Sequence, residues 1–311
     1  MPVEKLFPDF EIIDLRTSGA TIHCLRKGSG PPLLLLHGYP QTHVIWHKIA
    51  NRLSQTYTVI LTDLRGYGDS SKPEGGPRHE NYSFRAMARD QVDAMRELGY
   101  ETFFLGAHDR GARVAHRMCL DHPEVVRKVC VMDIVPTLTM YRETNQEFAT
   151  KYMWWFFLIQ KEPLPEHMIG ADSLFFLNMH FEIQNGTRGA LTDDALAEYR
   201  RCFCRPEAIH ASCEDYRASA DIDLEMDEAD KRANRKIEAA LLALWGGKGA
   251  IGKLWNVLDV WRGYSNGSVQ GRPLDSGHYL AEEQPEEVLR EMLRFFVKGE
   301  DHKLQADRQV A

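Results

Sequence analysis

The fold of this chain is decided by one segment, Phe103-Phe104-Leu105-Gly106-Ala107-His108-Asp109-Arg110-Gly111-Ala112-Arg113. An apolar run ends there in a small-x-Asp-x-Gly turn, and a stretch that favours a helix follows at once. This pattern is typical of a nucleophile elbow, a sharp strand-to-helix turn, with Asp109 at the position of the nucleophile. The helix would point its free N–H groups and partial positive charge at any ligand bound there. Because positive potential lowers the pKa of a carboxylate, Asp109 would stay charged and could attack a carbon atom.

The composition indicates a soluble globular protein, with 43% hydrophobic and 27% charged residues in a chain of 311. This length suits one large α/β domain with an insertion, or two domains. The net charge of -7 argues against nucleic acid as a partner, and any attraction of anions must therefore be local. The six cysteines form no CxxC pair and no His/Cys cluster, which favours free thiols in a reducing cytosol and no metal site.

Neither a signal peptide nor a membrane span is expected. The chain begins without the basic and apolar regions of a signal peptide. Its longest apolar run, Met153–Ile159, is too short to cross a bilayer. We therefore expect a cytoplasmic protein that has no membrane partner and requires no cofactor.

Strand and helix patterns alternate in two parts of the chain, 1–136 and 227–311. Between them, over 137–226, helical periodicity and aromatic residues predominate. We predict a mostly parallel α/β sheet with helices on both faces, formed by the two outer parts, and an inserted helical cap domain, formed by 137–226. The outer parts supply a hairpin (Glu11–Leu15, Thr21–Leu25), strands (Leu33–Leu36, Thr58–Thr62, Lys128–Met132, Ala239–Leu244, Gly267–Arg272), helices (Val44–Leu53, Tyr82–Leu98, Arg110–Asp121, Pro285–Val297) and a polar tail after Lys298 that is expected to fray.

Three residues with catalytic chemistry follow predicted strands: Asp109, Asp133 and His278. Ligands bind at the carboxyl ends of strands in an open α/β sheet, so these side chains should lie close together. Their order of nucleophile, acid and His is typical of a catalytic triad on this architecture. Each alone has a simpler explanation, because either Asp could cap a helix and His278 is one of 13 histidines.

A carboxylate nucleophile suits displacement at a saturated carbon, since its ester can be hydrolysed afterwards. Asp109 would expel a leaving group and form that ester. His278, oriented by Asp133, would then activate a water molecule that attacks the carboxyl carbon of Asp109. The backbone N–H groups of Tyr39 and Arg110 would stabilise the resulting oxyanion.

Two arginines stand beside this nucleophile. Arg110 and Arg113 are three residues apart at the start of one predicted helix, so they share a face. Two guanidinium groups there could hold a carboxylate, and an ion pair at 4 Å contributes about 4 kcal/mol at an intermediate dielectric constant. We therefore expect a small substrate with its own carboxylate next to the reacting carbon. Structural ion pairs with other acids are the alternative role for both arginines.

Several motifs resemble those of one family, the haloacetate (fluoroacetate) dehalogenases of the α/β-hydrolase superfamily. The resemblance covers nearly the whole chain and implies the α/β-hydrolase fold, with Asp109, Asp133 and His278 as the triad and Arg110 and Arg113 as the carboxylate clamp. It also implies a dimer formed through the cap. The motifs are His37-Gly38-Tyr39-Pro40-Gln41-Thr42-His43, Asp63-Leu64-Arg65-Gly66-Tyr67-Gly68-Asp69-Ser70, His108-Asp109-Arg110-Gly111-Ala112-Arg113, Cys213-Glu214-Asp215-Tyr216-Arg217 and Ser276-Gly277-His278.

The halide pocket departs from the family pattern. Members with a fluoride pocket carry His-Trp in a cap helix, and this chain has Trp154-Trp155. Trp155 keeps the indole N–H donor, whereas Trp154 replaces the His. The family also has a Tyr after the Cys-Glu-Asp-Tyr-Arg motif, where Asp221 stands here. A carboxylate facing a departing halide would repel it, so either Asp221 points elsewhere or the leaving group is not fluoride. Ordinary packing of the cap is the alternative role of Trp154 and Trp155.

Two other functions compete. An epoxide hydrolase resembles the chain in its His-Gly-x-Pro motif and its Asp-Leu-Arg-Gly-Tyr-Gly loop, but usually has an aromatic residue after the nucleophile, where Arg110 stands. Such an enzyme needs cap tyrosines that protonate the epoxide oxygen, and Tyr141, Tyr152 and Tyr216 are candidates. A non-catalytic ligand receptor on the same fold would have no need of a His that activates water.

Overall fold

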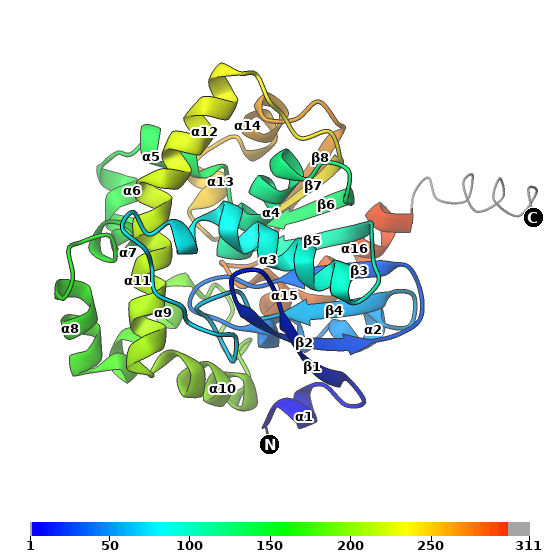
Figure 1. The fold of residues 1–311 in the computed structure, drawn as a ribbon, viewed down its shortest axis with the longest axis horizontal. Coiled ribbons are helices and arrows are strands. Elements are labelled where there is room, and N and C mark those ends of the chain that lie inside the picture. Colours follow the sequence, from blue (N-terminus) through cyan, green and yellow to red (C-terminus); the bar gives the residue numbers. More distant parts are fainter. Residues whose placement is uncertain (1, 298–311) are drawn as a thin grey trace, which may run out of the picture.

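The computed structural model describes residues 2–297, and its core is an eight-stranded sheet in the order β1-β2-β4-β3-β5-β6-β7-β8 (Figure 1). The hairpin β1–β2 is antiparallel and joins β4 in antiparallel orientation, whereas every later pairing is parallel. The predicted mostly parallel sheet is therefore confirmed. The strands are β1 (Glu11–Arg16), β2 (Thr21–Lys27), β3 (Pro32–Leu36), β4 (Thr58–Thr62), β5 (Phe103–His108), β6 (Val126–Met132), β7 (Ala240–Gly246) and β8 (Val269–Leu274). The tail predicted to fray lies outside the described residues.

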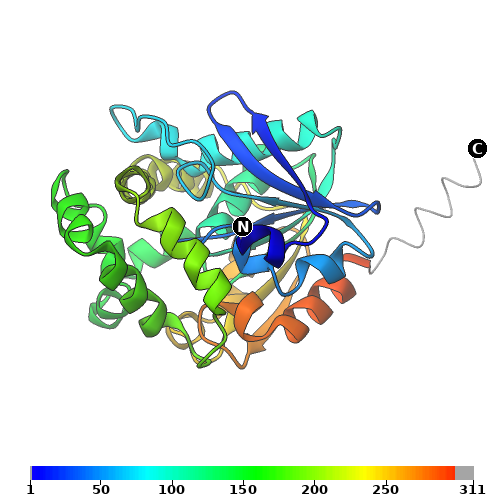
Figure 2. The same ribbon diagram turned by 90° about the horizontal axis from the view of Figure 1, so that it is seen from below.

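Helices cover both faces of this sheet. Helices α2 (Ala50–Leu53) and α16 (Pro285–Val297) lie on the face opposite α3 (Phe84–Glu97) (Figures 1 and 2). The central strands are apolar on both sides because both sides are covered, and β4 and β5 are buried along their whole length. Helix α4 (Asp109–Asp121) follows β5 directly and packs against α3. The carboxyl end of β5 therefore turns straight into a helix, as the elbow pattern predicted.

A run of helices without a strand separates β6 from β7, and it gathers on one side of the molecule beyond the sheet (Figure 1). The predicted cap boundary at 226/227 falls inside one continuous helix, α12 (Ile222–Arg232), and the assignment of 137–226 as a separate domain stays a prediction. The helices are α5 (Thr137–Arg142), α6 (Gln146–Lys151), α7 (Met153–Phe157), α8 (Leu164–Ala171), α9 (Ser173–Gln184), α10 (Asp193–Phe203), α11 (Pro206–Ala220) and α12.

The single helix predicted over Val44–Leu53 is wrong. The segment forms a 3-10 turn, η1 (His43–Trp46), and the separate short helix α2. Both the backbone N–H and the ring Nδ1 of His43 lie 2.8 Å from Asp63 Oδ1, which ties the first turn to the loop after β4. This tertiary contact overrides the helical spacing of the sequence.

The remaining elements are short. They are α1 (Pro2–Leu6), η2 (Glu80–Tyr82), α13 (Ile251–Leu254), α14 (Val257–Gly263) and α15 (Leu280–Glu283). Over residues 2–297, no helix combines the length and the apolar character that crossing a membrane requires.

Candidate active site

Asp109 lies at the bend between β5 and α4 with a left-handed backbone, at a φ of 46°. Two glycines permit the close approach of the chain around it. A Cβ on Gly38 would lie 2.6 Å from Asp109 Oδ1, and a Cβ on Gly111 would lie 2.2 Å from the carbonyl oxygen of His37. A strained turn of this kind persists only where the surrounding structure fixes it. The backbone therefore has the form expected of a nucleophile elbow.

The carboxylate of Asp109 does not cap α4. The N-cap residue of that helix is His108, whose side chain makes no capping bond. Asp109 Oδ1 instead accepts a hydrogen bond of 2.9 Å from the backbone N–H of Tyr39, and Oδ2 lies 3.8 Å from Nε2 of His278. The simpler role of a helix cap is thus excluded for Asp109, and one carboxylate oxygen is left facing the imidazole.

Asp133 holds the other side of that imidazole. His278 Nδ1 lies 2.6 Å from Asp133 Oδ2, and Asp133 Oδ1 accepts from the N–H of Gly246 at 2.8 Å. With Nδ1–H donating to the carboxylate, Nε2 of His278 is free to accept a proton, and it has no hydrogen-bond partner among the described residues. The structure therefore brings the three predicted residues together in a chain from Asp133 through His278 to Asp109.

Burial and charge act against each other in this group. Burial alone would raise the pKa of Asp109, but the positive charges of His278, His108, Arg113 and Arg110 hold this pKa below its usual value. Burial alone would lower the pKa of His278, but its hydrogen bond and charge interaction with Asp133 raise it above 6.5. Asp109 is therefore ionised at neutral pH, as attack on carbon requires.

Arg110 and Arg113 differ in whether a carboxylate balances their charge. Arg110 is buried and paired with Asp215: its Nε donates to Oδ2 at 2.9 Å, and its Nη2 donates to both Oδ1 and the carbonyl oxygen of the same residue. Nη1 makes only a long contact of 3.4 Å with Ser219 Oγ. Most of the guanidinium of Arg110 is therefore used in a structural ion pair, which was the alternative role expected for it. Only Nη1 remains available to a ligand.

Arg113 has no carboxylate partner within 4 Å among residues 2–297, although it is only 2% exposed. Its Nη1 donates to the carbonyl oxygen of Val135 and to Thr137 Oγ1, and its Nε is buried without a partner. Burial lowers the pKa of this guanidinium, and the charge of Asp109 opposes that shift. A buried cation without a counter-charge is costly, so an anionic ligand would stabilise it.

Trp155 lies against this arginine. Its ring is 4.5 Å from Arg113 Cζ, and its indole Nε1 is buried without a hydrogen-bond partner. Asp221 lies elsewhere: it forms an ion pair of 2.8 Å with Arg78, and its side chain is 47% exposed. The carboxylate of Asp221 therefore points to the surface and would not repel a halide near Trp155.

Asp215 is a neighbour of the candidate site that the sequence did not identify. It binds Arg110 and also accepts a 2.5 Å hydrogen bond from the hydroxyl of Tyr67. The motif Cys213-Glu214-Asp215-Tyr216-Arg217 marked the segment, but only the packing of α11 on the core pairs it with Arg110.

A cavity of about 200 Å³ adjoins the imidazole side of the site. Asp133, Tyr152 and His278 line it, together with three lysines (Lys151, Lys248 and Lys253) and the segment that follows α9. Asp109 is not among its lining residues and is 5% exposed. The imidazole of His278 and the carboxylate of Asp133 therefore face this cavity, whereas Asp109 does not line it.

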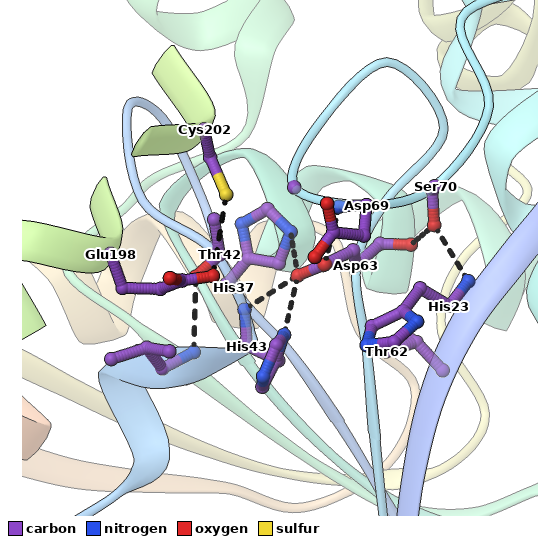
Figure 3. Close-up of polar contacts among 12 residues, drawn as sticks. His23, His37, Thr42, His43, Thr62, Asp63, Asp69, Ser70, Glu198 and Cys202 are labelled. Atoms are coloured by element: carbon purple, nitrogen blue, oxygen red, sulfur yellow. Dashed lines mark hydrogen bonds and ion pairs between the residues drawn. The ribbon is translucent and has the colours of Figure 1, made fainter. Parts of the chain in front are cut away.

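Among residues 2–297, two groups of side chains present atoms of the types that bind metals. His23, His43 and Asp63 form one group, which Figure 3 shows beside His37 and Thr42. There Asp63 Oδ1 accepts from His43 and Oδ2 accepts from the N–H of Asp69 at 2.9 Å. In the second group, Asp69, Glu198 and Cys202, both carboxylates form ion pairs with Arg201. Donors from the protein thus already occupy the carboxylate oxygens in both groups. Each group therefore connects neighbouring segments of the chain.

The chain is similar to proteins of known fold over nearly its whole length. The profile of a family described as alpha/beta hydrolase fold matches residues 31–285. A fluoroacetate dehalogenase of Burkholderia sp is 42% identical over 93% of this chain and 95% of its own. A soluble epoxide hydrolase of Corynebacterium sp. (strain C12) is 28% identical, covering 90% of this chain and 94% of its own.

Among solved structures, a candidate α/β hydrolase from Nostoc sp PCC 7120 superposes with a TM-score of 0.92 at 53% identity, over 94% of this chain and 99% of the other. The fold, the strained elbow and these identities agree. The chain belongs to the haloacetate (fluoroacetate) dehalogenase family of the α/β-hydrolase superfamily.

Proposed function

We propose that the protein is a hydrolytic dehalogenase that converts small 2-haloacids to the hydroxy acid and halide. The observation that carries this proposal is Arg113, a buried guanidinium without a carboxylate partner among the described residues, close enough for the charge of Asp109 to act on it. A substrate carboxylate would supply the missing counter-charge. The fluoroacetate dehalogenase activity of the Burkholderia relative is of the same class.

In the first step, Asp109 Oδ2 attacks the carbon that carries the halogen. The new carbon–oxygen bond forms as the halide leaves with the electrons of the carbon–halogen bond, which produces an aspartyl ester. Arg113, with the remaining Nη1 of Arg110, holds the substrate carboxylate during this displacement.

In the second step, Nε2 of His278 takes a proton from water, and the hydroxide adds to the carboxyl carbon of Asp109. The negative charge develops on Oδ1, which the N–H of Tyr39 already contacts at 2.9 Å. The N–H of Arg110, in the first turn of α4, has no intrahelical acceptor and supplies a second donor. Collapse of this intermediate releases the hydroxy acid, which takes its proton from His278, and one proton leaves for solvent.

An epoxide hydrolase of the same fold is the second candidate. The Corynebacterium relative has that activity, and the buried hydroxyl of Tyr141 makes no hydrogen bond among the described residues. Such a hydroxyl could donate to an epoxide oxygen. Against this candidate, a neutral epoxide would leave the charge of Arg113 unbalanced.

A panel of substrates separates the two. Chloroacetate, bromoacetate and fluoroacetate would be incubated with the protein under an ion-selective halide readout, beside styrene oxide and a neutral haloalkane. We expect chloroacetate or bromoacetate turnover. Halide release from the haloalkane but not from the haloacids would refute the role of Arg113, and diol formation from styrene oxide alone would favour the epoxide hydrolase.

The homodimer and the cytoplasmic location stay predictions.

A further inference from the structure

His108 lies at the end of β5, directly before the nucleophile Asp109. It is fully buried, and although it is the N-cap residue of α4, its side chain makes no capping bond. Its Nε2 lies 2.8 Å from the backbone carbonyl oxygen of His278. The ring centroids of these two histidines are 4.5 Å apart, and their planes are inclined at 53°. His108 therefore contacts His278 twice, once at the backbone and once at the imidazole.

The partner of His108 fixes which ring nitrogen carries the proton. A carbonyl oxygen can only accept a hydrogen bond, so Nε2 of His108 is the donor. Nδ1 then carries the lone pair, and it is buried without a hydrogen-bond partner among the described residues. Burial lowers the pKa of His108 to about 3, and the charge of His278 lowers it as well, while that of Asp109 opposes the shift. At neutral pH His108 is therefore uncharged, and it contributes positive charge only in acid, where Asp109 itself titrates.

The backbone of His278 is also bound to two helices. Its N–H donates at 3.0 Å to the carbonyl oxygen of Gln184, the last residue of α9. Its carbonyl oxygen accepts at 3.1 Å from the N–H of Leu280, the first residue of α15. These bonds place the loop of His278 relative to α9 and α15. The bond from His108 connects the same loop to β5, the strand that leads into Asp109.

This connection joins the two groups that must cooperate when the ester is hydrolysed. Nε2 of His278 lies 3.8 Å from Asp109 Oδ2 and takes a proton from water beside the carboxyl carbon of Asp109. A general base must stay within hydrogen-bond reach of the proton that it removes. His278 becomes positively charged in this step, and an uncharged neighbour does not repel it. A neutral His108 can therefore fix the position of the base without opposing its charge.

We propose that His108 is a positioning residue for the hydrolytic step, in which its Nε2–H and its ring hold the imidazole of His278 next to the ester on Asp109. The proposal rests on the dehalogenase function. His108 transfers no proton in this role and acts only through His278. Displacement of the halide needs Asp109 as nucleophile but no base, so loss of His108 should slow hydrolysis of the ester and spare its formation.

Three variants of the whole protein test this role. His108→Phe keeps a ring but removes the donor, and His108→Gln returns an N–H donor near the position of Nε2. His116→Phe is the matched control, because His116 is a buried histidine of α4 whose ring contacts Trp261 and Tyr264 instead. In one turnover of chloroacetate, rapid-quench mass spectrometry would follow the carboxymethyl ester on Asp109, and an ion-selective readout would follow the chloride.

We expect His108→Phe to hydrolyse the ester about tenfold more slowly, as the loss of one hydrogen bond predicts, and to form the ester at the rate of the parent protein. His108→Gln should recover most of the rate of hydrolysis. His116→Phe should keep the ratio of the two rates, even if it unfolds more easily. Equal slowing of both steps in His108→Phe, or no slowing of hydrolysis, would overturn the proposal.

A second measurement does not depend on turnover. The Nδ1–H of His278, which contacts Asp133 at 2.6 Å, should give a downfield proton NMR signal that disappears in His278→Gln. Exchange of this proton with water should be about tenfold faster in His108→Phe than in the parent protein, and close to the parent rate in His108→Gln. Equal exchange rates in all three proteins would overturn the role of His108. If the parent protein releases no halide from any haloacid, the dehalogenase function fails, whereas the exchange rates still decide whether His108 holds the imidazole.

Discussion

Arg110 and Asp215 form a buried ion pair in which the guanidinium uses Nε and Nη2 on one carboxylate. Both side chains are fully buried. Removing one partner of such a pair leaves an uncompensated buried charge, which typically costs about 3–5 kcal/mol. The negative charge of Asp215 also offsets that of Arg110, so the excess positive charge beside Asp109 comes from Arg113.

Arg113→Gln should weaken substrate recognition more than it weakens the fold. The substitution removes the charge that a substrate carboxylate would meet, and we expect kcat/KM for chloroacetate to fall about 100-fold or more. Steady-state kinetics would measure this loss. Arg113→Lys serves as the control and should retain part of the activity, because it keeps the charge without the planar donor geometry. An unchanged kcat/KM in Arg113→Gln would show that Arg113 does not bind substrate.

Asp215→Asn should act mainly on stability. It leaves the charge of Arg110 buried and unpaired, so the free energy of unfolding should fall by about 3–5 kcal/mol in urea titrations. Asp221→Asn is the matched control, since its ion pair with Arg78 is exposed and should contribute less than about 1 kcal/mol. Equal effects of the two substitutions would contradict the buried pair.

His278→Gln should stop the reaction after one turnover. Asp109 can still displace the halide, but no base remains to activate water, so the ester accumulates. Mass spectrometry of the peptide with Asp109 should detect one added carboxymethyl group after incubation with bromoacetate, together with one equivalent of bromide. A non-catalytic receptor would bind the acid and release no bromide.

The hydrolytic step should lose activity in acid. His278 acts as a base only when it is neutral, and its pKa is raised above 6.5 because Asp133 contacts it. The rate should therefore rise with pH through that raised pKa and level off above it. In Asp133→Asn this limb should move to lower pH, and kcat should fall by about 10³ to 10⁴. A pH profile that does not move in the variant would exclude Asp133 as the partner of His278.

The parts of the fold that the sequence predicted are those determined by local pattern. The apolar runs at Leu33–Leu36 and Lys128–Met132 became strands because both faces of the sheet are covered. The small residues Ala107 and Gly111 marked the bend at Asp109. The prediction of one helix over Val44–Leu53 was wrong because the first turn is bound by Asp63, which lies 20 residues from His43 in the sequence.

In the candidate site too, the residues marked by local sequence pattern could be predicted, and those placed by tertiary packing could not. Asp109, Asp133 and His278 could be found because each comes at the end of a strand. The partners of Arg110 could not be found in this way, since they depend on how α11 packs against the core. Asp221 had no local signal that it points to Arg78 at the surface.

In the proposed reaction, Asp109 forms an ester with a haloacid, and water then attacks the carboxyl carbon of Asp109 itself. One turnover with chloroacetate in water labelled with heavy oxygen tests it most directly. We expect the hydroxy acid from the first turnover to carry unlabelled oxygen from Asp109, and the label to appear in the Asp109 carboxylate. Labelled hydroxy acid from the first turnover, with an unlabelled Asp109, would contradict it.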